Sequence, residues 1–175
     1  MTLLAVANPI LRLLPGNARR ARAYRMVDED FSKARCVPQP SASCLLLRRA
    51  SLPPDGVFDE HYPIFFNDVQ LARTLYARGE ELWVTPDAVV THEQGASTRL
   101  LGASLKRQYL GSLIRMLEET EPARYVWIYR ALTLMQGLSL ILLRRPNALP
   151  VGELWKALTG DPGPVPQAPV GVASS

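Results

Sequence analysis

The chain reads Gly56-Val-Phe-Asp59-Glu60, then Phe65-Phe66-Asn67-Asp68-Val69-Gln70-Leu71, then Pro86-Asp-Ala-Val-Val-Thr-His92-Glu-Gln-Gly95-Ala-Ser97. Apolar residues at helical spacing follow Asn67, which predicts a helix with Asn67 as its N-cap and Gly79 as its C-terminal stop. Residues 81–85 and 88–91 read as two brief strands on either side of Pro86. An acidic residue therefore opens a helix, and a lone histidine leaves the second strand shortly before a glycine.

The composition is that of an ordinary globular protein. Of the 175 residues, 47% are hydrophobic and 21% are charged, which argues against wholesale disorder. The net charge is +4, and Lys33, Lys106 and Lys156 are the only lysines among 20 basic residues. Such an arginine excess suits phosphate-rich partners or an anionic membrane surface, or it solubilises helix faces. No basic stripe interleaved with aromatic residues indicates nucleic acid.

Cysteine usage is sparse. Cys36 and Cys44 form neither a zinc pattern nor a disulfide framework, which fits a reducing cytoplasm. Cys44 begins an apolar run that ends at Leu47, where we expect a small buried thiol. Residues 42–48 therefore read as a short buried strand.

The remaining N-terminal part carries weaker signals. Residues 1–14 have apolar positions compatible with a short helix, and residues 17–35 are polar and read as a connector. Residues 53–56 read Pro-Pro-Asp-Gly, which predicts a turn.

The character of the chain changes after Ser97. Residues 100–119 repeat apolar residues at a four-residue step, which predicts a long amphipathic helix. Pro122 precedes a second helix over 125–143 that is apolar nearly all round, and 152–159 predicts a short third helix. From Asp161 the chain is rich in Pro, Gly, Val, Ala and Ser, and we expect disorder.

Together these motifs resemble the acceptor-side half of family 2 glycosyltransferases, especially the rhamnosyltransferase-like members that build bacterial surface polysaccharide. The resemblance covers about residues 20–145. It implies an α/β fold, namely the C-terminal half of a GT-A (nucleotide-diphospho-sugar transferase) fold with a helical C-terminal extension and with the N-terminal nucleotide-binding half absent. The implied domains are a partial catalytic domain over 1–98, a helical extension over 99–160 and a disordered tail over 161–175.

Asp68 is the first candidate for a catalytic residue. The dipole of its helix stabilises a carboxylate in the first turn, although an Asp is also common there for stability alone. An ionised carboxylate can take the proton from an acceptor hydroxyl. The resemblance implies that Asp68 is the general base for inverting transfer. The acidic pair usual in the family reads Asn67-Asp68 here, so only its second member is retained.

His92 is the second candidate. A neutral imidazole is a good ligand for Mn²⁺ or Mg²⁺, although a lone histidine at a strand end is ordinarily a satisfied polar residue. The resemblance implies that His92 helps to hold the divalent ion and the leaving diphosphate, with Gly95 and Ser97 near that diphosphate. The other metal ligands belong to the absent half. We interpret Asp28-Glu29-Asp30 as a solvated loop rather than as an Asp-x-Asp metal motif.

Two further segments match the family pattern. Residues 39–49 resemble the segment beneath the acceptor site. Asp59 and Glu60 match a Gly-x-Phe-Asp-Glu element, and with Asn67 they are implied to shape the acceptor site or the loop before the catalytic helix.

The helix over 125–143 has three interpretations. Its length is near the ~20 residues that span a bilayer, but an Arg at mid-membrane costs about 3 kcal/mol, and Arg130 lies inside it. We favour a helix lying in the membrane interface, with Trp127 and Tyr129 at headgroup level and Arg144-Arg145 on lipid phosphate. Burial against another domain is the remaining interpretation.

The predicted function is that of an inverting, metal-dependent family 2 glycosyltransferase in truncated or split form. It would transfer a sugar from a nucleotide-diphospho-sugar to a saccharide or lipid-linked acceptor in cell-surface polysaccharide synthesis. The implied partners are the donor, the acceptor, a complementary N-terminal half and the inner face of the cell membrane, to which the protein would be peripheral. The alternative is an inactive remnant that serves as a membrane-associated interaction module.

Overall fold

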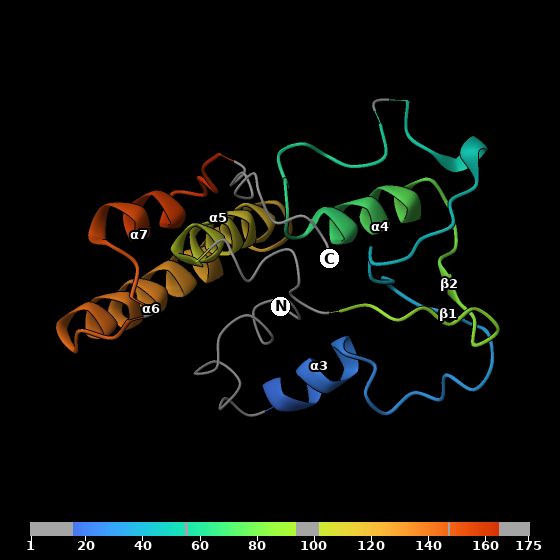
Figure 1. Ribbon diagram of the computed structural model, residues 1–175, viewed down its shortest axis with the longest axis horizontal. Helices are drawn as coiled ribbons and strands as arrows, with labels where there is room; N and C mark the ends of the chain where they lie inside the picture. The colour runs from blue at the N-terminus through green and yellow to red at the C-terminus, as the bar shows by residue number, and fades with distance from the viewer. Residues whose placement is uncertain (1–15, 55, 94–101, 147, 165–175) are drawn as a thin grey trace, which may run out of the picture. The chain divides into compact units, whose positions relative to one another are not determined.

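A computed structural model describes residues 16–54, 56–93, 102–146 and 148–164, and the chain divides into two compact units, Met1–His92 and Glu93–Ser175 (Figure 1). The first unit contains α3 (Asn17–Tyr24), β1 (Arg35–Cys36), the 3₁₀ turn η1 (Arg49–Ser51), α4 (Asn67–Ala77) and β2 (Trp83–Val84). The second contains α5 (Gly102–Thr120), α6 (Ala123–Leu142) and α7 (Val151–Leu158). The helix expected over 1–14 lies outside the described residues.

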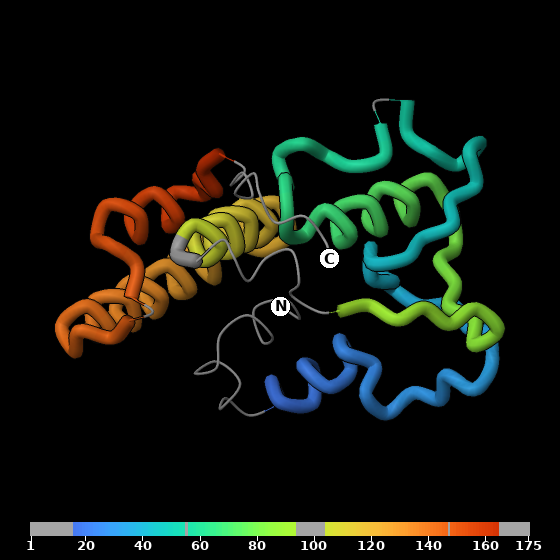
Figure 2. The backbone as a smooth tube through the Cα atoms, in the orientation of Figure 1, coloured from blue at the N-terminus to red at the C-terminus, as the bar shows by residue number. Residues whose placement is uncertain are grey.

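A two-stranded antiparallel sheet organises the first unit. Arg35 pairs with Val84 and Cys36 with Trp83, and the extended segments around the two strands run beside each other (Figure 2). The Val37 amide donates to the Leu82 carbonyl at 2.8 Å, which extends the pairing by one residue. The described residues contain this two-stranded sheet and no wider one, so they show no clear GT-A fold, and the α/β assignment stays a prediction.

The core of the first unit lies between α4 and this sheet. Leu71, Ala72 and Leu75 share one face of α4 because residues four apart meet on a helix. They pack with Val37 and Leu82, and all five side chains are buried. The position of α4 is therefore fixed by residues on both sides of the strand pair.

Gly79 ends α4 as predicted. Its φ of 80° lies in the left-handed region, where the absence of a Cβ removes the steric penalty. The Gly79 amide donates to the Tyr76 carbonyl at 2.9 Å, and the Glu80 amide donates to the Leu75 carbonyl at 3.0 Å. These two bonds form a Schellman motif that satisfies the last carbonyls of the helix.

The buried strand expected over 42–48 is wrong. These residues are irregular, and Leu45 and Leu47 pack against the core while Leu46 between them is fully exposed. Alternate side chains therefore point inward, as in a strand, but no strand in the described part of the chain pairs with the segment. Cys44 is exposed, so the expected buried thiol is also wrong.

Two other local predictions need correction. The connector expected over 17–35 begins with a helix, α3, in which Ala21 is buried. Of the two strands expected over 81–91, only the first forms, as β2, because its residues find β1 as a partner. Residues 88–91 are exposed and irregular. The turn expected at 53–56 is supported by the Gly56 amide, which donates to the Pro53 carbonyl at 3.3 Å.

Three helices make up the described part of the second unit, as the apolar periodicity predicted. The fully buried residues of α5 are Leu113, Ile114, Met116 and Leu117, together with Gln108 and Ser112. On α7, Leu154, Ala157 and Leu158 are buried and cluster with Leu110 and Leu149. A Cβ on Gly137 of α6 would lie 2.4 Å from Leu154 Cδ2, so α6 and α7 approach closely there.

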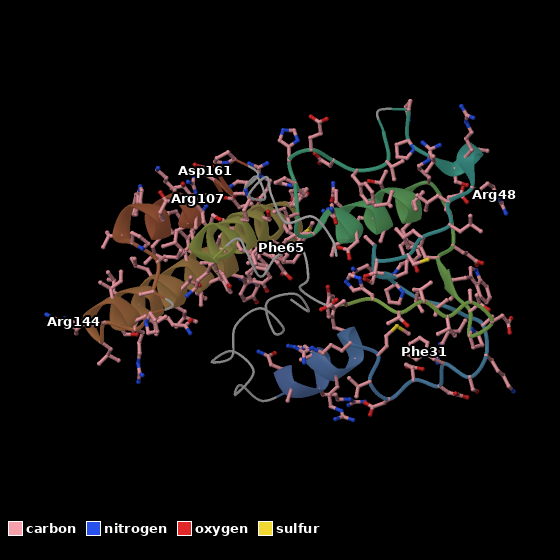
Figure 3. All side chains as sticks on the ribbon, in the orientation of Figure 1. Phe31, Arg48, Phe65, Arg107, Arg144 and Asp161 are labelled. Carbon is pink, nitrogen blue, oxygen red and sulfur yellow. The ribbon has the colours of Figure 1, made fainter. Side chains whose placement is uncertain are left out.

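Arg107 of α5 holds the chain that follows α7. Its guanidinium lies 2.8 Å from the Glu153 carboxylate and 2.6 Å from that of Asp161, forming what we call the Arg107 cluster (Figure 3). The buried Gln108 amide donates to the carbonyls of Gly163 at 3.0 Å and Pro164 at 2.6 Å. The disorder expected from Asp161 is therefore wrong for residues 161–164, since a buried amide needs the acceptors that they supply.

Candidate functional site

The loop that leads into α4 is shaped by Asp59. Its Oδ1 accepts the His61 amide at 2.9 Å and lies 2.7 Å from His61 Nδ1. The Asp59 carbonyl accepts the Tyr62 amide at 2.9 Å, and the Tyr62 side chain is buried. These bonds form a tight turn, whereas the neighbouring Glu60 side chain is exposed. Whether either carboxylate also contacts an acceptor stays a prediction.

Phe66 turns the chain into α4. Its φ of 67° is in the left-handed region, which is unusual for a bulky residue. It occupies the N-cap position without a side-chain cap, so the prediction of Asn67 as N-cap is wrong and Asn67 is the first helical residue. A strained backbone of this kind costs about 1–3 kcal/mol and is often found next to functional residues.

Asn67 and Asp68 are ordered by short-range hydrogen bonds. Asn67 Oδ1 accepts the Asp68 amide at 2.7 Å, and Asp68 Oδ1 accepts the Val69 amide at 2.8 Å. Among the described residues, Asp68 Oδ2 has no hydrogen-bond partner. The carboxylate therefore has a fixed orientation and one oxygen able to accept a proton.

Asp68 lines a small hollow, which we call the Asp68 hollow. Its other lining residues are apolar: Pro40, Leu45, Leu47, Leu71, Ala72, Leu75 and Leu82. The cavity is small: its volume is about 10 Å³, close to what one water molecule needs. Pro40, Leu45 and Leu47 thus lie next to the start of α4, although residues 42–48 do not form a strand. A hollow of this size can receive one hydroxyl group beside Asp68, but not a whole ligand.

His92 is not brought to this site. It is exposed, lies outside the lining of the Asp68 hollow, and has neither a hydrogen bond nor an ion pair with Asp68. Gly95 and Ser97 lie outside the described residues. Within the described ranges no three His, Cys, Asp or Glu side chains gather into a metal site. A role of His92 in metal binding stays a prediction.

The acidic run 28–30 is an exposed loop, as expected. Asp28 pairs with Arg22, and this hydrogen bond lowers the pKa of the Asp28 carboxyl. Glu29 pairs with Arg35 at 2.6 Å. Asp30 accepts the Ser32 amide at 2.9 Å, and this bond lowers its pKa. Each carboxylate is thus engaged locally, as in a loop that is shaped by its own charges.

Sequence reasoning missed three features of the site. His61 was not singled out, although its position two residues after Asp59 is typical of an Asx turn. The left-handed Phe66 has no signal in the sequence, since neither Gly nor Asn occupies the position. The contribution of Leu82 to the hollow depends on the pairing of β1 with β2, which is a tertiary feature.

Comparison with protein-family models, with curated proteins and with solved structures finds no match to this chain. The resemblance to family 2 glycosyltransferases therefore stays a prediction from the sequence motifs.

Proposed function

We propose that the chain supplies the acceptor side of an inverting glycosyltransferase of the family 2 type, with Asp68 as its general base. The donor is a nucleotide-diphospho-sugar, and the acceptor is a saccharide or a lipid-linked glycan. The nucleotide-binding half would come from a segment or chain outside these residues.

The observation that carries the proposal is the Asp68 hollow. Residues 39–49 and the helix start at Asp68 match separate parts of the family pattern, and they are apart in the sequence. In the structure, Pro40, Leu45 and Leu47 from the first part line the same hollow as Asp68. Two separate motifs thus line one hollow at Asp68, which supports a common role for them in binding the acceptor.

The chemistry asked of Asp68 is a single proton transfer. The acceptor hydroxyl gives its proton to Asp68 Oδ2, while its oxygen forms a bond to the anomeric carbon of the donor. The bond from that carbon to the diphosphate breaks, and the nucleoside diphosphate leaves with the electron pair. Attack from the opposite side inverts the anomeric configuration. The base need not be strong, because the anomeric carbon becomes cation-like as the diphosphate leaves.

The lining of the hollow limits how an acceptor is held. Seven of the eight lining residues carry apolar side chains, so the hollow offers few partners for the hydroxyl groups of a second sugar ring. A divalent ion such as Mn²⁺ or Mg²⁺ would neutralise the leaving diphosphate. His92, the ligand that the resemblance implies, lies outside the Asp68 hollow, so its part in holding the ion has no support from the described residues.

A second candidate is an inactive remnant that acts as an interaction module. The observation in its favour is that Asp68 and His92 do not share a site among the described residues. In that case the hollow would receive an apolar side chain of a partner rather than a substrate.

Reconstitution tests the proposal. The full chain is expressed with the coding region directly upstream of its own, and membranes are supplied with radiolabelled UDP-, GDP- and dTDP-sugars. We expect incorporation of label only when both are present, with inverted configuration in the product by NMR. Incorporation by the upstream product alone, or none from any donor with a folded complex, would support the remnant.

A further inference from the structure

A continuous apolar face of α6 is exposed. Its exposed large side chains are Trp127, Ile128, Met135, Leu138 and Leu142. Trp127, Leu138 and Leu142 are spaced by 11 and 4 residues, which places them on one side of a helix with 3.6 residues per turn. The buried residues of α6, Val126, Tyr129 and Thr133, lie on another side. Among the described helices, α6 alone is long and apolar enough to cross a membrane, judged by length and composition.

Arg130 does not interrupt this face. Its guanidinium donates to the Leu158 carbonyl at 2.8 Å and pairs with Glu118 of α5. The only charged group in the middle of α6 is therefore turned into the second unit. Tyr129 is likewise buried, and this desolvation raises its pKa. The expectation that Tyr129 lies at headgroup level is wrong for this reason.

Helix α7 extends the same face. Gly137 of α6 contacts Leu154 of α7, and the next residues, Leu138 and Trp155, are exposed by 46% and 64%. A helix turns by about 100° per residue, and α6 and α7 run in opposite directions in Figure 1, so both side chains emerge on the same side of the pair. Val151, one turn before Trp155, is also exposed.

The charges on α6 and next to its two ends have one sign. No Asp or Glu lies between Glu121 and Glu153, whereas that stretch contains Arg124, Arg130, Arg144 and Arg145. The net charge of the chain is +4, so without these four arginines the basic and acidic residues would balance. Since Arg130 is paired internally, the exposed ones are Arg124 at the start of α6 and Arg144 and Arg145 just after its end. Arg144 extends from the tip of α6 in Figure 3.

We propose that the exposed face of α6 and α7 lies flat on an anionic membrane surface. Its apolar residues would enter the acyl boundary, with Trp127 and Trp155 at headgroup level. Arg124 would contact lipid phosphate at one end of α6 and Arg144 and Arg145 at the other. This surface, which includes α7, is independent of the proposed transferase activity and fits either candidate function.

The packing favours this arrangement over a spanning α6. A spanning helix would have to separate from α5 and α7. It would then lose the pairing of Arg130 with Glu118, the bond of Arg130 to the Leu158 carbonyl and the close contact of Gly137 with Leu154. It would also place the Arg130 charge in hydrocarbon. A flat orientation keeps all of these contacts.

Single-tryptophan variants test which surface touches lipid. The chain has three tryptophans, so three full-length variants each retain one of them and carry Phe at the other two positions. They are mixed with phosphatidylcholine–phosphatidylglycerol vesicles that contain brominated lipid. We expect quenching of Trp127 and of Trp155, and none of Trp83, which is 58% exposed in the first unit. Quenching of Trp83 alone, or of Trp127 without Trp155, would overturn the proposed surface.

Vesicle sedimentation tests the charge and the flat orientation. Arg144→Gln with Arg145→Gln should weaken binding to anionic vesicles by roughly 25-fold, since each basic residue near such a surface contributes about fivefold. Leu138→Glu should also weaken binding, whereas the control Leu46→Glu, at an exposed leucine of the first unit, should not. Equal binding to vesicles of phosphatidylcholine alone, or retention through carbonate washing until detergent is added, would contradict the proposal.

Discussion

Leu47 and Asp68 line the same hollow, although they come from segments that the sequence predicted separately. One belongs to an irregular segment whose alternate side chains pack on the core, and the other opens α4. The left-handed Phe66 and the bonds from Asn67 and Val69 orient the carboxylate. The proposed role of Asp68 depends on this placement of an oriented carboxylate beside apolar side chains.

The full chain by itself should not bind a nucleotide-diphospho-sugar. The Asp68 hollow offers one carboxylate and apolar side chains, which disfavour an anionic diphosphate. Calorimetry with UDP-, GDP- and dTDP-sugars in the presence of Mn²⁺ should therefore show no binding in the micromolar range. Micromolar binding of any of these donors would mean that the chain holds a donor site of its own.

Gly111 of α5 should tolerate a side chain poorly. A Cβ there would lie 2.6 Å from the backbone of Pro162, so alanine has to displace residues 161–164. Displacement would leave the buried Gln108 amide without its acceptors. We expect Gly111→Ala to lower the free energy of unfolding by about 1–3 kcal/mol, measured by urea denaturation.

Gly152 is the matched control in the same unit. A Cβ at this position of α7 meets nothing within 4 Å, and its φ is not positive. Because alanine is the better helix former, Gly152→Ala should stabilise α7 by about 0.5 kcal/mol. Equal effects of the two substitutions would show that the contact with Pro162 does not govern stability.

The Arg107 cluster should make the second unit sensitive to acid. Hydrogen bonds from Arg107 lower the pKa of Glu153, and the Gly163 amide and Arg107 lower that of Asp161. Carboxylates with lowered pKa values stabilise the fold above their unfolded pKa values, near 4, and lose this contribution as the pH falls through the folded values. The Tm difference between wild type and Arg107→Met should therefore be larger at pH 7 than at pH 2.5. A difference independent of pH would assign the role of Arg107 to packing alone.

Every described α-helix except α3 could be predicted from the sequence, because helices depend on local periodicity and on end signals. The sequence placed α5, α6, α7 and the glycine stop of α4 within a few residues. It overestimated the strands, because a strand needs a partner that the sequence does not name. Residues 83–84 pair with β1, whereas no strand among the described residues pairs with 42–48 or with 88–91.

The candidate site was accessible to sequence reasoning only in part. The first-turn position of Asp68 is local and could be predicted, but the conformation of Phe66 and the internal pairing of Arg130 could not. In the sequence, Arg130 interrupts an apolar helix. In the structure, Glu118 and the Leu158 carbonyl accept its hydrogen bonds, so its charge does not face the exposed side of α6. Such pairings are long-range and depend on how α5, α6 and α7 pack.

The most direct test of the central claim is the turnover of Asp68→Asn in the reconstituted transferase. An amide of the same shape can still accept the Val69 amide, but it cannot take a proton, so we predict a loss of about 10²–10⁴-fold in rate. Asn67→Asp and the exposed control Asp87→Asn should stay within a few-fold of wild type. Near-full turnover of Asp68→Asn, together with loss of activity in Asn67→Ala, would contradict the assignment of Asp68 as the general base.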